Sequence, residues 1–403
     1  MKRIDILVFV FLCLFVAGGI LGEFVWAFLL VGCLVFATAQ RKEGVLYERQ
    51  SVSSADALVL LICVSEVLSA LLSEYRSNSV KASFPVLLAV SFWFFFRMFI
   101  KERNQRRYFS IGMAGLSFVL SAITIGTYIS FRKEFAIFEG VILLEFKQSF
   151  SPLGITVNDW VAFLLCLFPF PFVSAVETSS RKLSVLYTAS SVLAFAAVAL
   201  CLSRGAFIAL AVFYLLVIAF NLRSSKRRIR KVMIVALISF IAGFGICFPA
   251  YEEIGTTLAM TKTSTQNRSM EGRLKQLEDA LELWKDRPLT GVGGGNFNIV
   301  YDSRIRDKKG SSVRAASTYL LILVEKGALG VVAYGGLILS IMVLGFKNLR
   351  RKQVDPVYLA GFVMMCVRGL FFSSFFYSRM VLALVMLLAL FTVQEIVTDE
   401  KKG

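Results

Sequence analysis

The sequence contains no histidine, the side chain that proteins most often use as a general base near neutral pH or as a zinc ligand. Its absence excludes Ser-His-Asp triads, histidine general bases and zinc sites built on histidine. Cysteine offers no substitute, because no CxxC spacing occurs and none of the seven cysteines lies in a long hydrophilic stretch. We therefore expect no metal, no cofactor and no disulfide framework.

Long polar stretches are also scarce, and apolar runs fill most of the chain. Hydrophobic residues make up 57% of the 403 residues, above the roughly even share of soluble domains. The runs are about 17 to 25 residues long, enough to cross the ~30 Å hydrocarbon core as helices. They are continuous rather than alternating, which argues against a β-barrel. The sequence thus predicts an all-α polytopic membrane protein.

The apolar runs divide into about twelve predicted spans. We place them near residues 5–20, 22–39, 56–72, 82–100, 108–130, 155–177, 184–202, 205–221, 232–250, 315–345, 355–371 and 376–397. Residues 1–250 then hold nine helices, residues 251–314 one large loop, and residues 315–403 three helices and the C-terminal tail. Lys2 and Arg3 precede the first run as in a signal peptide, but no cleavage site stands out, so we expect a retained first helix.

Positive charge lies in short clusters at every second connection between these spans, although the formal net charge reaches +17. Examples lie within residues 41–49, 101–107, 223–231 and 347–352. This arrangement excludes a nucleic-acid partner and follows the positive-inside rule, which puts the clusters and both termini in the cytoplasm. Long loops are exempt from the rule, so the 251–314 loop is predicted to be extracytoplasmic.

The large loop contains one amphipathic helix signal. Apolar residues recur there at spacings of four and three, as on one face of a helix: Met270, Leu274, Leu277, Leu281 and Trp284. Ser269 can cap this helix and Pro288 follows its last turn. We expect the stripe to face inward, against the membrane surface or the helical bundle, with Arg273 at its edge and aimed at the mouth of the bundle. The alternative is an ordinary surface helix along which the arginine merely extends.

A glycine-rich segment, residues 290–297, follows this helix. It has no preceding strand and no GK[ST] ending, so we favour a tight turn with close backbone approach over a phosphate nest. A basic run then leads to the next span, formed by Arg304, Arg306, Lys308, Lys309 and Arg314. Such a run is typical of a solvated face or of contacts with lipid head groups.

Two arginines lie where helices are expected to meet the outer leaflet. Ser203-Arg204-Gly205 separates two apolar runs with almost no loop, and Arg368 lies in the outer half of its span. An arginine at such depth is costly unless it faces a polar cavity or the interface. We predict that Arg204, Arg273 and Arg368 converge on one outer pocket, where guanidinium groups can bind a diphosphate bidentately.

Three motifs occur in order along the chain. They are SRGAFIAL at 203–210, GRLKQLEDALELWKDRPLTGVGGGNF at 272–297 and STYLLILVEKGALG at 317–330. The series resembles the O-antigen ligase and Wzy-type polymerase superfamily of bacterial surface polysaccharides. That family has a Ser-Arg-Gly turn, a periplasmic loop with GR…W…P..G.G..F, and HN.YL..L.E.G..G at the start of the next span.

This resemblance implies a metal-independent, inverting glycosyltransferase of the GT-C class in the bacterial cytoplasmic (inner) membrane. Its donor would be a glycan on undecaprenyl diphosphate and its acceptor a glycolipid or another glycan, with membrane lipids and other polysaccharide-assembly proteins as further partners. By the same resemblance, Arg204 and Arg273 would act as catalytic residues that stabilise the charge on the departing diphosphate. Predicted depth alone adds Arg368 to the substrate-binding set. Weaker candidates for phosphate contacts are Arg304, Arg306 and Arg314.

The sequence departs from the family where ligases carry His-Asn, because this chain has Ala316-Ser317. That histidine is commonly assigned a role at the acceptor hydroxyl, so a polymerase is favoured over a ligase. Glu325 is a candidate general base or else a capping or packing residue, and Tyr319 can orient a sugar or pack in the core. The remaining alternative is a polysaccharide or lipid transporter, which should carry internal repeats and charges through the full bilayer depth.

Overall fold

The computed structural model describes residues 53–99, 103–135, 149–222, 224–260, 265–304, 317–373 and 379–393. These ranges contain α-helices and one short 3₁₀ helix but no strand, so the predicted all-α class is confirmed for them. Seven helical segments in the described residues are long and apolar enough to cross a membrane, and two shorter apolar helices accompany them. The chain is therefore a multi-pass membrane protein. The first two of the twelve predicted spans lie outside the described residues.

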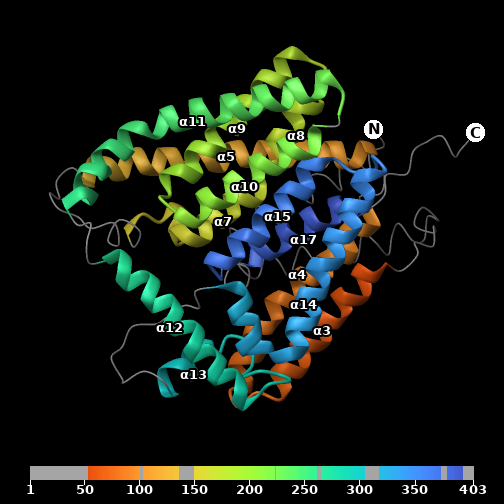
Figure 1. Cartoon of the computed structure of the whole chain (residues 1–403), viewed down its shortest axis with the longest axis vertical. Helices are drawn as coiled ribbons and strands as arrows, with labels where there is room; N and C mark the ends of the chain where they lie inside the picture. The colour runs from red at the N-terminus through yellow and green to blue at the C-terminus, as the bar shows by residue number, and fades with distance from the viewer. Residues whose placement is uncertain are drawn as a thin grey trace, which may run out of the picture.

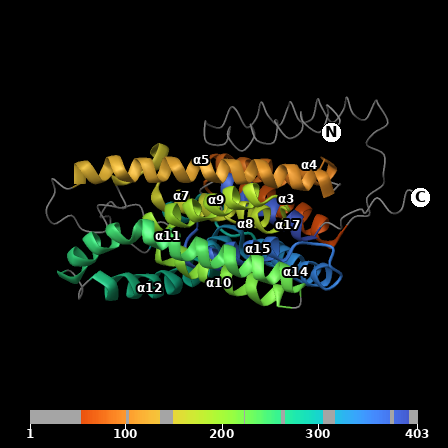
Figure 2. The same cartoon turned by 90° about the horizontal axis from the view of Figure 1, so that it is seen from above.

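The described residues form fourteen helical segments, one of them a 3₁₀ helix. In chain order they are α3 (Ser54–Leu71), α4 (Arg76–Phe99), α5 (Arg103–Phe135), η1 (Pro152–Gly154), α7 (Val157–Leu167), α8 (Pro169–Glu177), α9 (Arg181–Leu200), α10 (Arg204–Asn221), α11 (Lys226–Met260), α12 (Thr265–Asp286), α13 (Phe297–Arg304), α14 (Thr318–Arg350), α15 (Pro356–Phe371) and α17 (Arg379–Val393). Helices α5, α9 and α11 pack together on one side of the molecule, and α3 and α14 pack together on the other (Figures 1 and 2).

Local sequence signals set where several of these helices begin. Ser53 and Asp56 form a reciprocal capping box at the start of α3, in which each side chain accepts a hydrogen bond from the other residue's backbone N–H. The carboxylate of Asp355 accepts a hydrogen bond from the Val357 N–H at the start of α15, where Pro356 has no N–H that needs an acceptor. These polar caps stand at the edges of apolar runs, which is why the sequence located the runs well.

The centre of the bundle is the α7–α8 pair, whose whole apolar window, Val157–Glu177, is buried. Pro169 begins α8 after a slight interruption, because proline cannot continue the hydrogen-bond pattern of α7. Aromatic side chains fill the space around it, for example Phe168, whose ring meets those of Phe213 and Tyr214 edge-on at 5.3 and 5.9 Å. A segment buried on every side gives the surrounding helices a fixed support.

Helices α12 and α13 lie at one end of the bundle, beside the start of α14 (Figure 1). We call this the loop end. Helix α12 runs across the direction of α14 and α3 in Figure 1 rather than along it. A small apolar core joins these elements at the loop end, and its members are Ala280, Leu283, Val292, Phe297, Val300, Tyr301, Leu320, Leu321 and Val324. The long loop is thus folded onto the membrane helices.

Candidate active site

The turn between α9 and α10 contains the Ser203-Arg204-Gly205 motif. Leu202 adopts a left-handed conformation with φ 51°, which lets the chain reverse with almost no loop. Ser203 stands before α10 and is buried, whereas Arg204 is the first residue of the helix and is exposed. The arginine therefore stands at the amino end of α10, where the backbone N–H groups also favour negative charge.

The side chain of Arg368 lies directly against this turn. A Cβ atom added at Gly205 would lie 2.9 Å from Nη1 of Arg368 and 2.8 Å from Cβ of Phe371. Only glycine leaves room for the guanidinium at this point. Arg204 and Arg368, far apart in the sequence, are thus brought to the same place by the packing of α10 on α15.

Arg368 is almost completely buried, with 2% of its surface exposed. Its Nη2 lies 3.5 Å from both the backbone oxygen and Oδ1 of Asn158, at the long end of the hydrogen-bond range. Its Cζ lies 5.2 Å from the centre of the Phe372 ring, a cation–π contact. The sequence did not point to Asn158, because a single asparagine near the start of an apolar run does not indicate its partner.

The start of α14 is fixed to the same end of α15. Hydroxyl groups of three consecutive residues donate to backbone oxygens near the carboxyl end of that helix: Ser317 to Gly369 at 3.2 Å, Thr318 to Phe372 at 2.9 Å and Tyr319 to Cys366 at 2.8 Å. These bonds satisfy carbonyl groups that a helix end leaves without intrahelical partners. The motif that begins at Ser317 therefore stands beside Arg368, and the hydroxyl of Tyr319 is directed at α15.

The glycine-rich segment packs backbone to backbone against a break in α14. Gly327 has φ 63° and ψ −159°, which interrupts the helix, and a Cβ there would lie 2.6 Å from the Leu289 oxygen. The groups released by the break bond to the loop: Val292 N–H donates to Val324 at 2.9 Å, Gly293 N–H to Glu325 at 3.0 Å, and Ala328 N–H to Pro288 at 2.8 Å. The glycines thus form a tight turn with close backbone approach, as predicted.

Glu325 is buried at this junction. Its Oε1 accepts a hydrogen bond of 3.1 Å from the N–H of Phe297, the first residue of α13, and its backbone oxygen accepts one from the Ser69 hydroxyl at 2.7 Å. A carboxylate at a helix amino end both satisfies a free N–H and stabilises the helix dipole. These contacts favour the capping alternative for Glu325, and its role as a general base stays a prediction.

The next residue, Lys326, forms a buried ion pair that the sequence did not suggest. Its Nζ lies 2.5 Å from Oε2 of Glu66 on α3, and the Tyr334 hydroxyl donates to Oε1 of the same glutamate at 2.8 Å. Both charged side chains are at most 3% exposed. A lysine within a predicted span implies a nearby acid on physical grounds, but the sequence alone does not identify which one.

Helix α12 corrects one expectation from the sequence. The helix begins at Thr265 rather than at Ser269, and its buried residues are Gln276, Ala280 and Leu283. Leu274, Leu277 and Leu281 are 59%, 46% and 40% exposed, so these residues of the stripe do not pack against the bundle, and the alternative of a stripe against the membrane surface stays a prediction. The face of α12 that packs on α14 is therefore the one that carries Ala280 and Leu283, not the predicted stripe.

Four of the predicted site arginines have side chains outside the described part of the structure. Arg273 and Arg304 belong to α12 and α13, but their side chains lie outside the described part of the structure. Arg306, Arg314 and the replaced family position Ala316 lie wholly outside the described residues. The convergence of Arg273 with Arg204 and Arg368 therefore stays a prediction.

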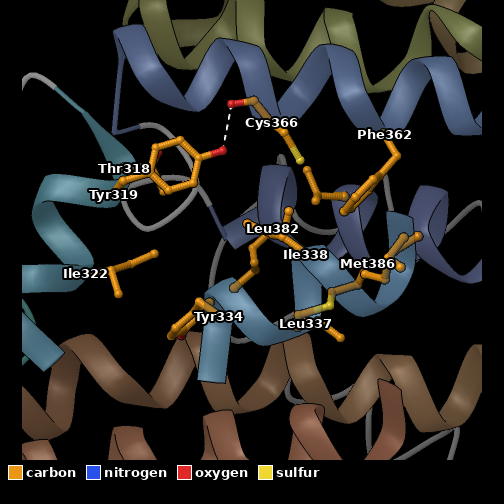
Figure 3. Close-up of a pocket in the computed structure, with 13 residues that line it drawn as sticks. Thr318, Tyr319, Ile322, Tyr334, Leu337, Ile338, Phe362, Cys366, Leu382 and Met386 are labelled. Atoms are coloured by element: carbon orange, nitrogen blue, oxygen red, sulfur yellow. Dashed lines mark hydrogen bonds between the residues drawn. The ribbon is translucent and has the colours of Figure 1, made fainter. Parts of the chain in front are cut away.

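A partly open apolar cavity of about 40 Å³ lies behind Tyr319, between α14, α15 and α17 (Figure 3). The Tyr319 ring stands at one end, with its hydroxyl directed to Cys366, and the rest of the lining is mainly aliphatic and aromatic (Figure 3). Such a cavity has room for a small apolar group but offers little to a sugar or a phosphate. The polar chemistry of this end lies outside it, at Arg204 and Arg368.

A comparison with known families matches the part of the chain that contains the α9–α10 turn, the glycine-rich segment and the start of α14. The family model described as O-antigen ligase matches residues 189–335. This part of the chain is therefore similar to the O-antigen ligase family, and we refer to it as the O-antigen ligase domain. The match confirms the resemblance drawn from the three motifs and supports a membrane enzyme of polysaccharide assembly. No curated protein matches the chain. The O-antigen ligase domain includes Arg204, Arg273 and Glu325, whereas Arg368 lies beyond its end.

Proposed function

We propose that this protein is a metal-independent, inverting glycosyltransferase of the GT-C class that joins undecaprenyl-diphosphate-linked saccharides on the outer face of the cytoplasmic membrane. One observation carries the proposal: the guanidinium of Arg368 lies against the first turn of α10, next to Arg204. Arg204, Arg368 and the amino end of α10 would then bind one anionic group. That arrangement suits a diphosphate.

In this reaction the acceptor hydroxyl attacks the anomeric carbon from the face opposite the diphosphate. A new glycosidic bond forms while the bond to the lipid diphosphate breaks, and the electron pair leaves with the diphosphate oxygen. Arg204, Arg368 and Arg273 would stabilise that developing negative charge, which is their catalytic contribution. Arg304, Arg306 and Arg314 would contact further phosphates on the donor or acceptor.

The hydroxyl proton requires a base, and Glu325 is the candidate that the sequence offered. Its Oε1 already accepts the Phe297 N–H, so we assign Glu325 a positioning role at the start of α13. Tyr319 likewise donates to the Cys366 oxygen and supports the start of α14 rather than a sugar. The proposed catalytic contribution of the described residues is therefore electrostatic, and the hydroxyl proton passes through solvent to an oxygen of the departing diphosphate.

Polymerisation is the reaction we favour, because Ala316 replaces the histidine that the family pattern places before the Tyr-Leu pair. Transfer to a separate lipid or protein acceptor is the second candidate, supported by the match to the O-antigen ligase family. Transport without transfer is a third, which would leave the arginine pair without a chemical role.

Purified protein in liposomes, supplied with a synthetic undecaprenyl-diphosphate-linked repeat unit, tests the proposal. Mass spectrometry of the lipid fraction should show a ladder of longer chains on the same carrier. Arg204→Ala and Arg368→Ala should each slow chain growth by roughly 100- to 1000-fold. Arg227→Ala, which removes an exposed arginine from the 223–231 cluster, is the matched control and should leave the rate unchanged.

The product separates the alternatives. Growth that occurs only when a second acceptor is added would indicate a ligase, and movement of unchanged donor between leaflets would indicate a transporter. Full transfer by both arginine variants would show that the diphosphate is bound elsewhere.

A further inference from the structure

Helix α12 has three distinct faces. Gln276, Ala280 and Leu283 are at most 5% exposed and pack toward Leu320, Leu321 and Val324 of α14. At 100° per residue, Leu277, Leu281 and Leu274 lie about 100° to 160° around the helix from Gln276. The described charged residues Lys275, Glu278, Glu282 and Lys285 lie beyond them, on the remaining arc.

The middle face is the unusual one, because it is apolar and yet uncovered. Leu274, Leu277 and Leu281 each expose 40% or more of their surface, and they form one row along the helix. A row of exposed leucines bordered by charges is typical of a helix that lies in the plane of a membrane interface.

The end of α12 is attached at the level where a membrane span ends. Nη1 of Arg287, the residue after α12, donates to the Leu72 oxygen at 2.7 Å, and its Nη2 lies 3.8 Å from Glu74. Leu72 caps α3, one of the helices able to span the membrane. The last leucines of α3, Leu71 and Leu72, are 56% and 55% exposed, as expected of a lipid-facing surface.

We propose that the leucine face of α12 lies in the lipid leaflet at the loop end of the bundle, with the charged face turned to water. The occupant is a lipid surface because the end of α12 is bonded to Leu72, where the lipid-facing side of α3 stops, and because the charges border the leucine row on the side away from the bundle. Both features are what a leaflet requires of an interfacial helix.

This placement has a consequence for Arg273. By helical register its backbone position lies about 60° from Gln276, between the face packed on α14 and the leucine face. A residue at that boundary is next to both protein and lipid. A phosphate group carried on a membrane lipid would reach it from the leaflet without crossing the aqueous loop.

Electron paramagnetic resonance of nitroxide labels tests the leaflet contact without any use of enzymatic activity. Cysteine is introduced singly as Leu277→Cys, Leu281→Cys, Lys275→Cys or Glu282→Cys in the full chain, in nanodiscs of phosphatidylethanolamine and phosphatidylglycerol. Relaxation by oxygen, which concentrates in lipid, is compared with relaxation by a water-soluble nickel chelate. The parent protein, labelled in parallel, gives the background from its native cysteines.

Labels at 277 and 281 should favour oxygen over nickel several-fold, and labels at 275 and 282 should favour nickel. Equal exposure of all four labels to nickel would overturn the proposal. Labels at 277 and 281 shielded from both reagents would also overturn it, since a second copy or another protein would then cover the leucines. Should Leu277→Cys fail to fold, Leu274→Cys on the same face replaces it.

Discussion

Two basic residues are buried near the loop end of the bundle, and their surroundings differ. Lys326 meets the carboxylate of Glu66 at 2.5 Å, deep between α3, α4 and α14. Arg368 lies against the first turn of α10, where its described contacts include two neutral oxygens of Asn158 and the ring of Phe372. Lys326 is held by an acidic side chain, whereas Arg368 lies against the turn that follows Arg204 and begins α10.

This difference suggests a structural role for Lys326 and a functional role for Arg368. An ion pair between buried groups compensates two charges at once, and it holds the broken helix α14 against α3. Arg368 lies against the first turn of α10, where the backbone N–H groups of the helix amino end also favour negative charge. We therefore assign Lys326 to the scaffold, and Arg368 stays a proposed substrate contact.

The largest effect is expected from breaking the ion pair. Lys326→Met would leave Glu66 buried without its cation and should lower the free energy of unfolding by about 3–5 kcal/mol. The double variant Lys326→Met with Glu66→Gln removes both charges and should recover most of that loss. Thermal unfolding in detergent measures both, and equal destabilisation of the single and double variants would refute the assignment to the scaffold.

The variant Gly205→Ala should lower stability less than Lys326→Met does, but it should strongly slow glycan transfer. Gly205→Ala places a methyl group 2.9 Å from the Arg368 guanidinium, which must shift, and a misplaced catalytic group can cost up to ~100-fold in rate. Gly335→Ala in α14 is the matched control, because a Cβ there meets nothing within 4 Å. If the transfer rate of Gly205→Ala equals that of Gly335→Ala, the position of Arg368 does not matter.

Glu325 precedes Lys326 in the chain, and substitutions at Glu325 distinguish a general base from a residue that caps α13. Glu325→Gln keeps an oxygen that can accept the Phe297 N–H, so a capping residue should retain most activity, whereas loss of a general base costs roughly 10²–10⁴-fold. Glu325→Ala removes the acceptor and should lower the free energy of unfolding by about 1–3 kcal/mol. If Glu325→Gln protein is fully stable but inactive, Glu325 acts as the general base.

The smallest effect is expected from Ala316→His, which restores the family residue next to the start of α14. If the missing histidine separates ligase from polymerase, the variant should transfer more glycan to an added acceptor at unchanged rates of chain growth. The ratio of the two products in the liposome assay measures this. An unchanged ratio would mean that the branch is decided elsewhere in the chain.

Much of the scaffold was predictable because apolar runs with polar caps leave few alternatives in a membrane. The Ser53 capping box, the Asp355-Pro356 start and the short turn at Ser203 stand where the sequence placed helix ends. The partners of single buried residues were not predictable. Nothing in the sequence connects Lys326 with Glu66 or Arg368 with Asn158, because such contacts depend on how the helices pack.

The amphipathic helix shows a second limit. Periodicity correctly indicated a helix around Arg273, but the leucine row that seemed to be its buried face is exposed. Periodicity reports that a face is apolar and does not distinguish a protein core from a lipid leaflet. Ala280, the residue that contributes fully to the core, is too small to dominate any hydrophobic pattern.

The sequence by itself determined the membrane class, the helical segments and the family, because hydrocarbon forces backbone groups into helices and short motifs keep their order along the chain. Only the tertiary structure decided that α14 is broken at Gly327 to receive the glycine-rich turn, and that Arg368 rests on Gly205. Both depend on distances of a few ångströms between segments remote in sequence, and such distances are fixed by packing alone.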